Sequence, residues 1–106
     1  MNRIVNLTPH TINVILPTGL TVSYQSEWVA RVATYVSVTG SHEGVPLSRQ
    51  VYGAIVGLPE PREGVLYVVS GLVRSAVPSR TDVASPGELV RNEAGQPIGC
   101  LGFVVN

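Results

Sequence analysis

Side chains that can bind an anion are concentrated between Val65 and Cys100. This stretch contains three arginines and one aspartate close to several hydroxyl groups: Arg74, Arg80, Arg91 and Asp82. Guanidinium groups bind phosphate or carboxylate through two parallel hydrogen bonds, and a neighbouring carboxylate can orient a guanidinium or accept from a sugar hydroxyl. We therefore predict that these four side chains bind an anionic ligand. Ion pairs that brace a long loop are the alternative that the same residues leave open.

The spacing of these residues is compatible with a common pocket. Arg74 follows Ser70 by about one helical turn, so both can face the same side of a helix. Ser70 stands where it can cap that helix, predicted at residues 71–77. Arg80 and Asp82 are two residues apart and share one face if the chain is extended there.

His10 is a further candidate for the ligand site. It lies in Thr8-Pro9-His10-Thr11, where a proline interrupts a strand. Its imidazole could contact a phosphate or act as a general base. The alternative is structural, with His10 bonded to a backbone carbonyl so that it fixes the turn.

Arg31 is the last candidate. Arg31 and Arg49 lie on strands that flank the loop at 39–44, and either could share a face with Tyr35 or Tyr52. Arginines beside an aromatic ring suit a ligand that combines a base with phosphates. Solvated strand faces explain these two arginines equally well.

The sequence contains no recognised catalytic or metal-binding motif. The single cysteine, Cys100, lies in an apolar segment, and the two histidines and the carboxylates lack metal-ligand spacing. Phosphate-loop and dinucleotide-binding glycine patterns are absent as well. We therefore predict a non-enzymatic protein without metal or cofactor. A small hydrolase that uses His10 with Asp82 or Ser70 is a weaker alternative, because no nucleophile motif surrounds Ser70.

The elements that must position these residues are mostly β-strands. Alternating polar and apolar residues, β-branched runs and Gly/Pro turns support this prediction. Strands are predicted at 3–7, 11–16, 20–24, 28–38, 45–56, 65–69 and 98–105, with a polar loop and a strand within 79–91 and a surface connection at 57–64. Gly53 is predicted to form a bulge or a point of close approach. The chain, residues 1–106, is predicted to be a single β-rich α+β domain, either a small barrel or a curved antiparallel sheet with one short helix.

The composition predicts a self-associating protein. Charged residues make up 13% of the chain, about half the usual ~25%, so part of the surface must be weakly polar and suited to a partner. The net charge of zero argues against binding to a nucleic acid polymer or to an anionic membrane surface. The N-terminus does not resemble a signal peptide, and no apolar run reaches membrane-spanning length. We therefore expect a homo-oligomer in the cytoplasm.

Three segments carry a resemblance to a known family. They are NLTPHTINV at 6–14, GLPEPREGVLYVVSGLV at 57–73 and RTDVASPGELVRNEAGQPIGC at 80–100. Together they resemble small proteins encoded by phages and prophages, many of them in actinobacterial hosts. The resemblance implies a phage-associated protein that acts inside the host cell. By analogy with small β-rich phage proteins that counter host defences, it suggests a sponge for a nucleotide-derived immune signal.

Two functions are therefore expected from the sequence. The first is an oligomeric, non-enzymatic phage protein that binds a nucleotide-derived anion through Arg74, Arg80 and Arg91, with Asp82 and His10 completing the site. The second is a protein–protein interaction module, either a virion accessory protein or an inhibitor of a host protein. The low surface charge favours the second function as much as it favours self-assembly.

Overall fold

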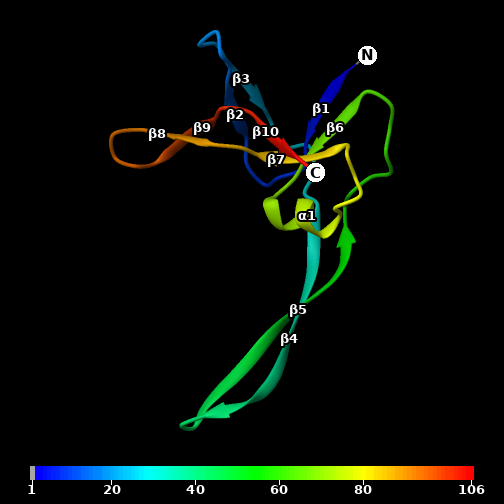
Figure 1. Ribbon diagram of the computed structural model, residues 1–106, viewed down its shortest axis with the longest axis vertical. Coiled ribbons are helices and arrows are strands. Elements are labelled where there is room, and N and C mark those ends of the chain that lie inside the picture. The colour runs from blue at the N-terminus through cyan, green and yellow to red at the C-terminus, as the bar shows by residue number, and fades with distance from the viewer. Residues whose placement is uncertain (1) are drawn as a thin grey trace.

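The computed structural model describes residues 2–106, which form ten strands and one short helix (Figure 1). In chain order these elements are β1 (Arg3–Asn6), β2 (Ile12–Ile15), β3 (Thr21–Tyr24), β4 (Arg31–His42), β5 (Val45–Val56), β6 (Val65–Val68), α1 (Gly71–Ala76), β7 (Val83–Pro86), β8 (Leu89–Arg91), β9 (Pro97–Cys100) and β10 (Phe103–Val105). The predicted β-rich α+β class is confirmed. Within residues 2–106, no helix combines the length and apolar character needed to cross a bilayer.

The strands form three sheets, where the sequence predicted one barrel or one curved antiparallel sheet. The first sheet has the order β1-β6-β7-β10, the second has the order β3-β2-β9-β8, and β4 pairs only with β5. No barrel closes among the described residues. In the first sheet β1, β6 and β7 run parallel, and α1 forms the connection from β6 to β7. The strand predicted at 98–105 is in fact two strands, because the chain leaves the second sheet after Cys100 and enters the first at Phe103.

The strand β6 lies at the centre of the core. Successive side chains of a strand point to opposite faces, so β6 and the residue after it contribute to both hydrophobic clusters. One cluster contains Leu7, Ala30, Tyr67, Val69, Val73 and Val83, and the other contains Ile12, Val14, Val68 and Cys100. Burial on both faces explains why the sequence here is a continuous apolar run, as is usual for parallel strands.

The helix α1 begins as the sequence predicted. Ser70 is its N-cap, and its hydroxyl accepts a hydrogen bond from the Val73 N–H at 3.3 Å. Val73 is the buried residue of the helix and joins the first cluster. This short helix therefore anchors the segment that leads to β7.

Asn6 connects the strand break at Thr8–His10 to β3. Its side chain is fully buried. The amide nitrogen donates to the carbonyls of His10 and Tyr24, both at 2.8 Å, and the amide oxygen accepts from the N–H and the hydroxyl of Thr8, at 2.9 and 2.7 Å. All four hydrogen-bonding positions of this amide are therefore satisfied.

The β4–β5 hairpin, called the arm below (residues 31–56), projects from the rest of the molecule (Figure 1). The molecule measures 56 × 39 × 21 Å with a radius of gyration of 17.0 Å, whereas a compact chain of this length has about 13 Å. The register moves from Val32↔Ile55 to Thr34↔Tyr52, which leaves one extra residue in β5. This confirms the bulge predicted at Gly53.

Candidate functional site

Arg80 and Asp82 form a bidentate ion pair. The Nε of Arg80 donates to Oδ1 of Asp82 at 2.7 Å, and its Nη2 donates to Oδ2 at 2.8 Å and to the Pro59 carbonyl at 3.0 Å. Hydrogen bonding from Arg80 holds the pKa of Asp82 below its ordinary value, although partial burial opposes this, and the same bond raises the pKa of Arg80. The pair ties the segment before β7 to the loop at 57–64, which is the bracing role that the sequence left open.

The other two arginines of the predicted set also bond to nearby protein groups. Arg74 donates from Nε to the buried Ser85 hydroxyl at 2.8 Å and from Nη1 to Oδ1 of Asn106 at 3.2 Å. Arg91 donates to the Gly95 carbonyl at 2.8 Å, within the β8–β9 turn. Neither of the two pockets described below has any arginine from the predicted set in its lining. Their role in binding a ligand stays a prediction.

Arg31 and Arg49 lie at separate positions along the arm. Arg31 pairs with Val56 at the base, and Arg49 pairs with Ser37. The two positions are six residues apart along β4, or about 20 Å at ~3.3 Å per residue. The backbone positions of the two arginines are therefore well separated within a single chain.

His10 contributes to its turn through the backbone. Its carbonyl accepts from the side chains of Asn6 and Thr8, so those two residues fix the break in place of the imidazole. The imidazole is exposed and lines a pocket at the carboxyl ends of β1, β6 and β7. We call this the carboxyl-end pocket.

The carboxyl-end pocket combines parts of all three segments that carry the family resemblance. Its volume is about 660 Å³, and its lining comes from residues 8–13, 70–71, 86, 89 and 97–100. Most of these side chains are apolar, and no lysine, arginine, aspartate or glutamate is among them. Its chemistry suits an uncharged group better than a phosphate.

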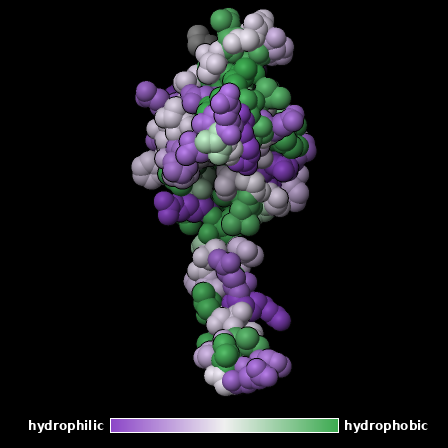
Figure 2. Space-filling model, turned by 90° about the vertical axis from the view of Figure 1, so that its left-hand side faces the viewer, coloured by the Kyte–Doolittle hydropathy of each residue, from purple (hydrophilic) through white to green (hydrophobic). Residues whose placement is uncertain are grey.

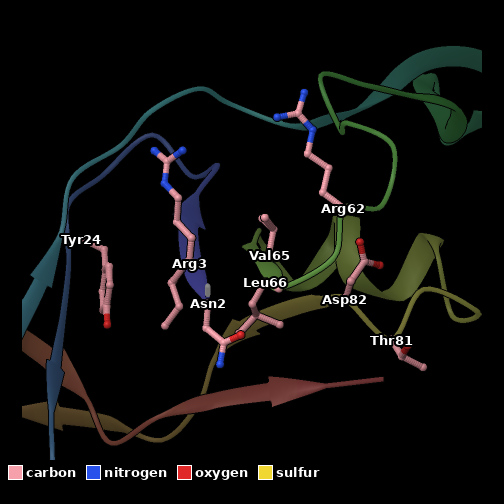
Figure 3. Close-up of a pocket in the computed structure, with 10 residues that line it drawn as sticks. Asn2, Arg3, Tyr24, Arg62, Val65, Leu66, Thr81 and Asp82 are labelled. Atoms are coloured by element: carbon pink, nitrogen blue, oxygen red, sulfur yellow. The ribbon is translucent and has the colours of Figure 1, made fainter.

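A second pocket lies at the amino ends of the same three strands (Figure 3). We call it the amino-end pocket; its volume is about 770 Å³, and Ile4, Val65 and Leu66 form its apolar part. Arg3 opens β1 opposite Val65, the first residue of β6, and its N–H donates to the Gly64 carbonyl at 2.7 Å. Parallel pairing of β1 with β6 therefore positions the lining.

Polar and aromatic side chains surround this apolar part. Arg3, Arg62, Tyr24, Asn2, Thr81 and Asp82 contribute to the lining. In Figure 3 the side chains of Arg3 and Arg62 extend toward the same side, and the Tyr24 ring stands at the edge beyond Arg3. Tyr24 is held in place by Phe103, whose ring centroid lies 6.2 Å away.

The electrostatics of the amino-end pocket favour an anion. Arg3 forms an ion pair with Glu27, and the carboxylate of Asp82 is neutralised by Arg80. Arg62 is exposed and makes neither an ion pair nor a side-chain hydrogen bond within the part of the chain that the structure describes. Its guanidinium is therefore available to a ligand.

Comparisons with known proteins found no relative of this chain. No family model, curated protein sequence or solved structure matches the chain.

Of the residues around the amino-end pocket, sequence analysis identified Asp82 and missed Arg3, Arg62 and Tyr24. One local signal pointed to Arg62, because Pro-Arg-Glu-Gly at 61–64 places a charged residue in a Pro/Gly-rich surface loop.

Proposed function

We propose that this protein is a non-enzymatic module that captures a small nucleotide-derived anion in the amino-end pocket. The observation that carries this proposal is the presence of two arginines and a tyrosine, from three separate segments, around one hollow. Guanidinium groups suit phosphates, and an aromatic ring offers a surface on which a base can stack. A volume of about 770 Å³ falls in the range of small-molecule sites, roughly 300–1,000 Å³.

Each lining residue has a role that follows from its chemistry. Arg62 would donate to phosphate oxygens, and Arg3 would add a second guanidinium while it keeps its contact with Glu27. Tyr24 would stack on the base. Asn2 and Thr81 supply an amide and a hydroxyl for sugar or base atoms.

The amino-end pocket fits this ligand better than the carboxyl-end pocket does. A phosphate needs charged or well-oriented donors when it leaves water. The carboxyl-end pocket offers only the exposed His10 as an ionisable polar group beside the buried Cys100. In the phage setting that the sequence resemblance implies, capture in the amino-end pocket would remove a signal by mass action and would need no turnover.

Isothermal titration calorimetry tests the proposal with a defined panel of nucleotides. The panel contains cyclic mononucleotides, cyclic dinucleotides, ADP-ribose and its cyclised forms, with inorganic phosphate as the minimal anion. Arg62→Gln should weaken binding by about 10- to 100-fold, because charge-assisted hydrogen bonds contribute about 1.5–3 kcal/mol. Arg91→Gln removes another exposed arginine, outside the pocket, and should leave affinity within about twofold, a change below ~0.5 kcal/mol; a larger loss would instead support the arginine site predicted from the sequence.

Two results would count against this assignment. If no member of the panel binds, the capture function is wrong. If a nucleotide binds and His10→Ala abolishes binding while Arg62→Gln does not, the ligand occupies the carboxyl-end pocket.

A role in protein–protein association is supported by a different feature. The arm exposes large apolar side chains outside both pockets, and such surfaces usually contact a partner. The chemistry of the arm favours a second copy of this chain over a host protein as that partner.

A further inference from the structure

The arm exposes a large group of apolar side chains. Nearly all of its residues are exposed, in contrast to those of β6. Its exposed large apolar residues are Tyr35, Val36, Val38, Val45, Leu47, Val51, Tyr52 and Val56, with Val36 73% and Tyr35 63% exposed. Figure 2 shows apolar side chains at intervals along this projection.

Apolar side chains occupy both faces of the arm. Paired residues of an antiparallel ladder point to the same side. The Tyr35 face carries Tyr35 opposite Val51, Leu47 opposite Gly40 and Val45 opposite His42, with the polar pair Ser37 and Arg49 between the first two. The Val36 face carries Val36 opposite Gln50, Val38 opposite Ser48 and Tyr52 opposite Thr34. A solvated hairpin would have at least one polar face, so two apolar faces indicate that both are covered in the functional state.

The backbone edges of the arm are open as well. In the described chain β4 pairs only with β5, so the outer edge of each strand has unpaired N–H and C=O groups. Long apolar edges without proline or charge favour pairing with another strand. Residues 32–41 of β4 contain neither. The uninterrupted part of this edge runs from Thr34 to Val38, between the two register shifts of the arm, and an isolated two-stranded ribbon is only marginally stable in water.

The charge pattern points to a second copy of the same chain as the occupant. The arm has three fully charged residues, Arg31, Glu43 and Arg49, and none between residues 32 and 41. The charge that two packed copies must keep apart is therefore mainly Arg49, which lies on the Tyr35 face opposite Ser37. The same pattern offers little attraction to a strongly acidic or basic partner.

The available area is large enough for such an interface. At about 150–220 Å² for each complete Val, Leu or Tyr, the exposed fractions of the eight side chains correspond to roughly 800 Å² per chain. One partner in a stable complex contributes about 800 Å². We propose that the arm is the self-association element of this protein and that the arms of two copies pack against each other, with both faces contributing to one interface.

Sedimentation velocity from about 1 to 100 μM tests this proposal with threonine substitutions. Threonine keeps the β-branched shape that strands favour and adds no charge. One variant alters the Val36 face (Val36→Thr, Val38→Thr, Tyr52→Thr), one alters the Tyr35 face (Tyr35→Thr, Val45→Thr, Leu47→Thr), and a third combines them. Each single-face variant should raise the dissociation constant of the dimer by about 100-fold, and the combined variant should be a monomer.

The matched control is Leu20→Thr, which removes an apolar side chain that is 67% exposed in the turn between β2 and β3. It should leave the assembly unchanged. Circular dichroism checks that each variant retains its strands. The mass of the wild-type protein tests self-association even if a variant does not fold.

Two outcomes overturn the proposal. One is a wild-type monomer at 100 μM, including the case in which the arm instead captures a host protein in a pull-down. The other is an oligomer that all three arm variants preserve. None of the substituted arm residues lines the amino-end pocket. The combined variant should therefore bind the same nucleotide as the wild type if the proposed function is right, whether or not the arm mediates self-association.

Discussion

Substitution of Asn6 by aspartate should be among the most damaging single changes in this protein, although it replaces only one NH₂ group by oxygen. Asn6 is fully buried. Its amide nitrogen donates to the carbonyls of His10 and Tyr24, both at 2.8 Å. The Asn6→Asp variant loses both donors and points a carboxylate oxygen at two carbonyl oxygens.

The expected cost follows from these contacts. Each buried hydrogen-bonding group left without a partner costs about 1–3 kcal/mol, and a buried charge without a counterion adds to this. We therefore expect Asn6→Asp to lower the free energy of unfolding by about 3–5 kcal/mol. A domain of this size has about 5–15 kcal/mol in total. The variant should therefore be close to unfolding at 37 °C.

The pH dependence gives this prediction a specific signature. Burial without a cationic neighbour raises the pKa of the introduced carboxyl above its unfolded value. As pH falls through that raised pKa, the carboxyl gains a proton and can donate one of the lost bonds. The difference in stability from wild type should therefore shrink on going from pH 8 to pH 5.

Urea denaturation followed by circular dichroism measures the effect. The control is Asn13→Asp, because the Asn13 amide oxygen accepts from Ser23 at 2.6 Å, a bond that the carboxylate keeps, while its nitrogen makes only a 3.4 Å contact. This control should cost less than about 1 kcal/mol. If Asn6→Asp costs no more than the control, or if its cost is the same at both pH values, Asn6 does not organise the strand break as we argue.

Two further substitutions test the loop at 57–64 and its anchor. Asp82→Asn should lower the free energy of unfolding by about 1–2 kcal/mol at pH 7. Because Arg80 lowers the pKa of Asp82, the stabilisation from the ion pair is present above the unfolded pKa of about 3.9 and is lost as pH falls through the lower folded pKa. The stabilities of variant and wild type should therefore converge when they are measured at decreasing pH. Gly57→Ala should cost about 2–3 kcal/mol, because Gly57 has φ +86° and an added Cβ would lie 2.7 Å from the Val29 carbonyl. The control is Gly19→Ala, because Gly19 has φ +88° and no atom lies within 4 Å of the added Cβ; this variant should cost only about 1 kcal/mol. Equal melting temperatures for the two alanine variants would contradict the close contact between position 57 and the Val29 carbonyl.

Local signals explain the parts of the fold that could be predicted. Turn residues and alternation locate the β2–β3 hairpin, and Ser70 marks the start of α1, because these features depend on a few adjacent residues. The parallel pairing of β1 with β6 depends on contacts between distant segments. The split of residues 98–105 between two sheets depends on such contacts too, and a run of apolar residues does not reveal it.

The arm shows a second limit of sequence patterns. A strand with apolar residues on both faces normally lies in a core. In this chain the same pattern occurs in β4 and β5, which are exposed along almost their whole length. The pattern is typical of a covered strand, but it does not show whether a covering surface would belong to the same chain or to another copy.

The candidate site illustrates the same distinction. The sequence prediction relied on charged residues that lie close together in the sequence, and such residues often form hydrogen bonds and ion pairs with one another or with nearby backbone. Arg80 pairs with Asp82 two residues away, and Arg91 bonds to the Gly95 carbonyl four residues away. Arg3 and Arg62 share a pocket only because β1 lies beside β6 in parallel register.

The predicted stretch and the observed pocket meet at the loop from 57 to 64. Arg80, fixed by Asp82, donates to the Pro59 carbonyl at 3.0 Å, and the Tyr67 hydroxyl donates to the Glu60 carbonyl at 3.3 Å. These bonds hold the first half of the loop against the core, so that Arg62 leaves it at the rim of the amino-end pocket. Arg80 lies outside the pocket lining but positions the backbone that carries the free Arg62 guanidinium, whereas Asp82 fixes Arg80 and also lines the pocket.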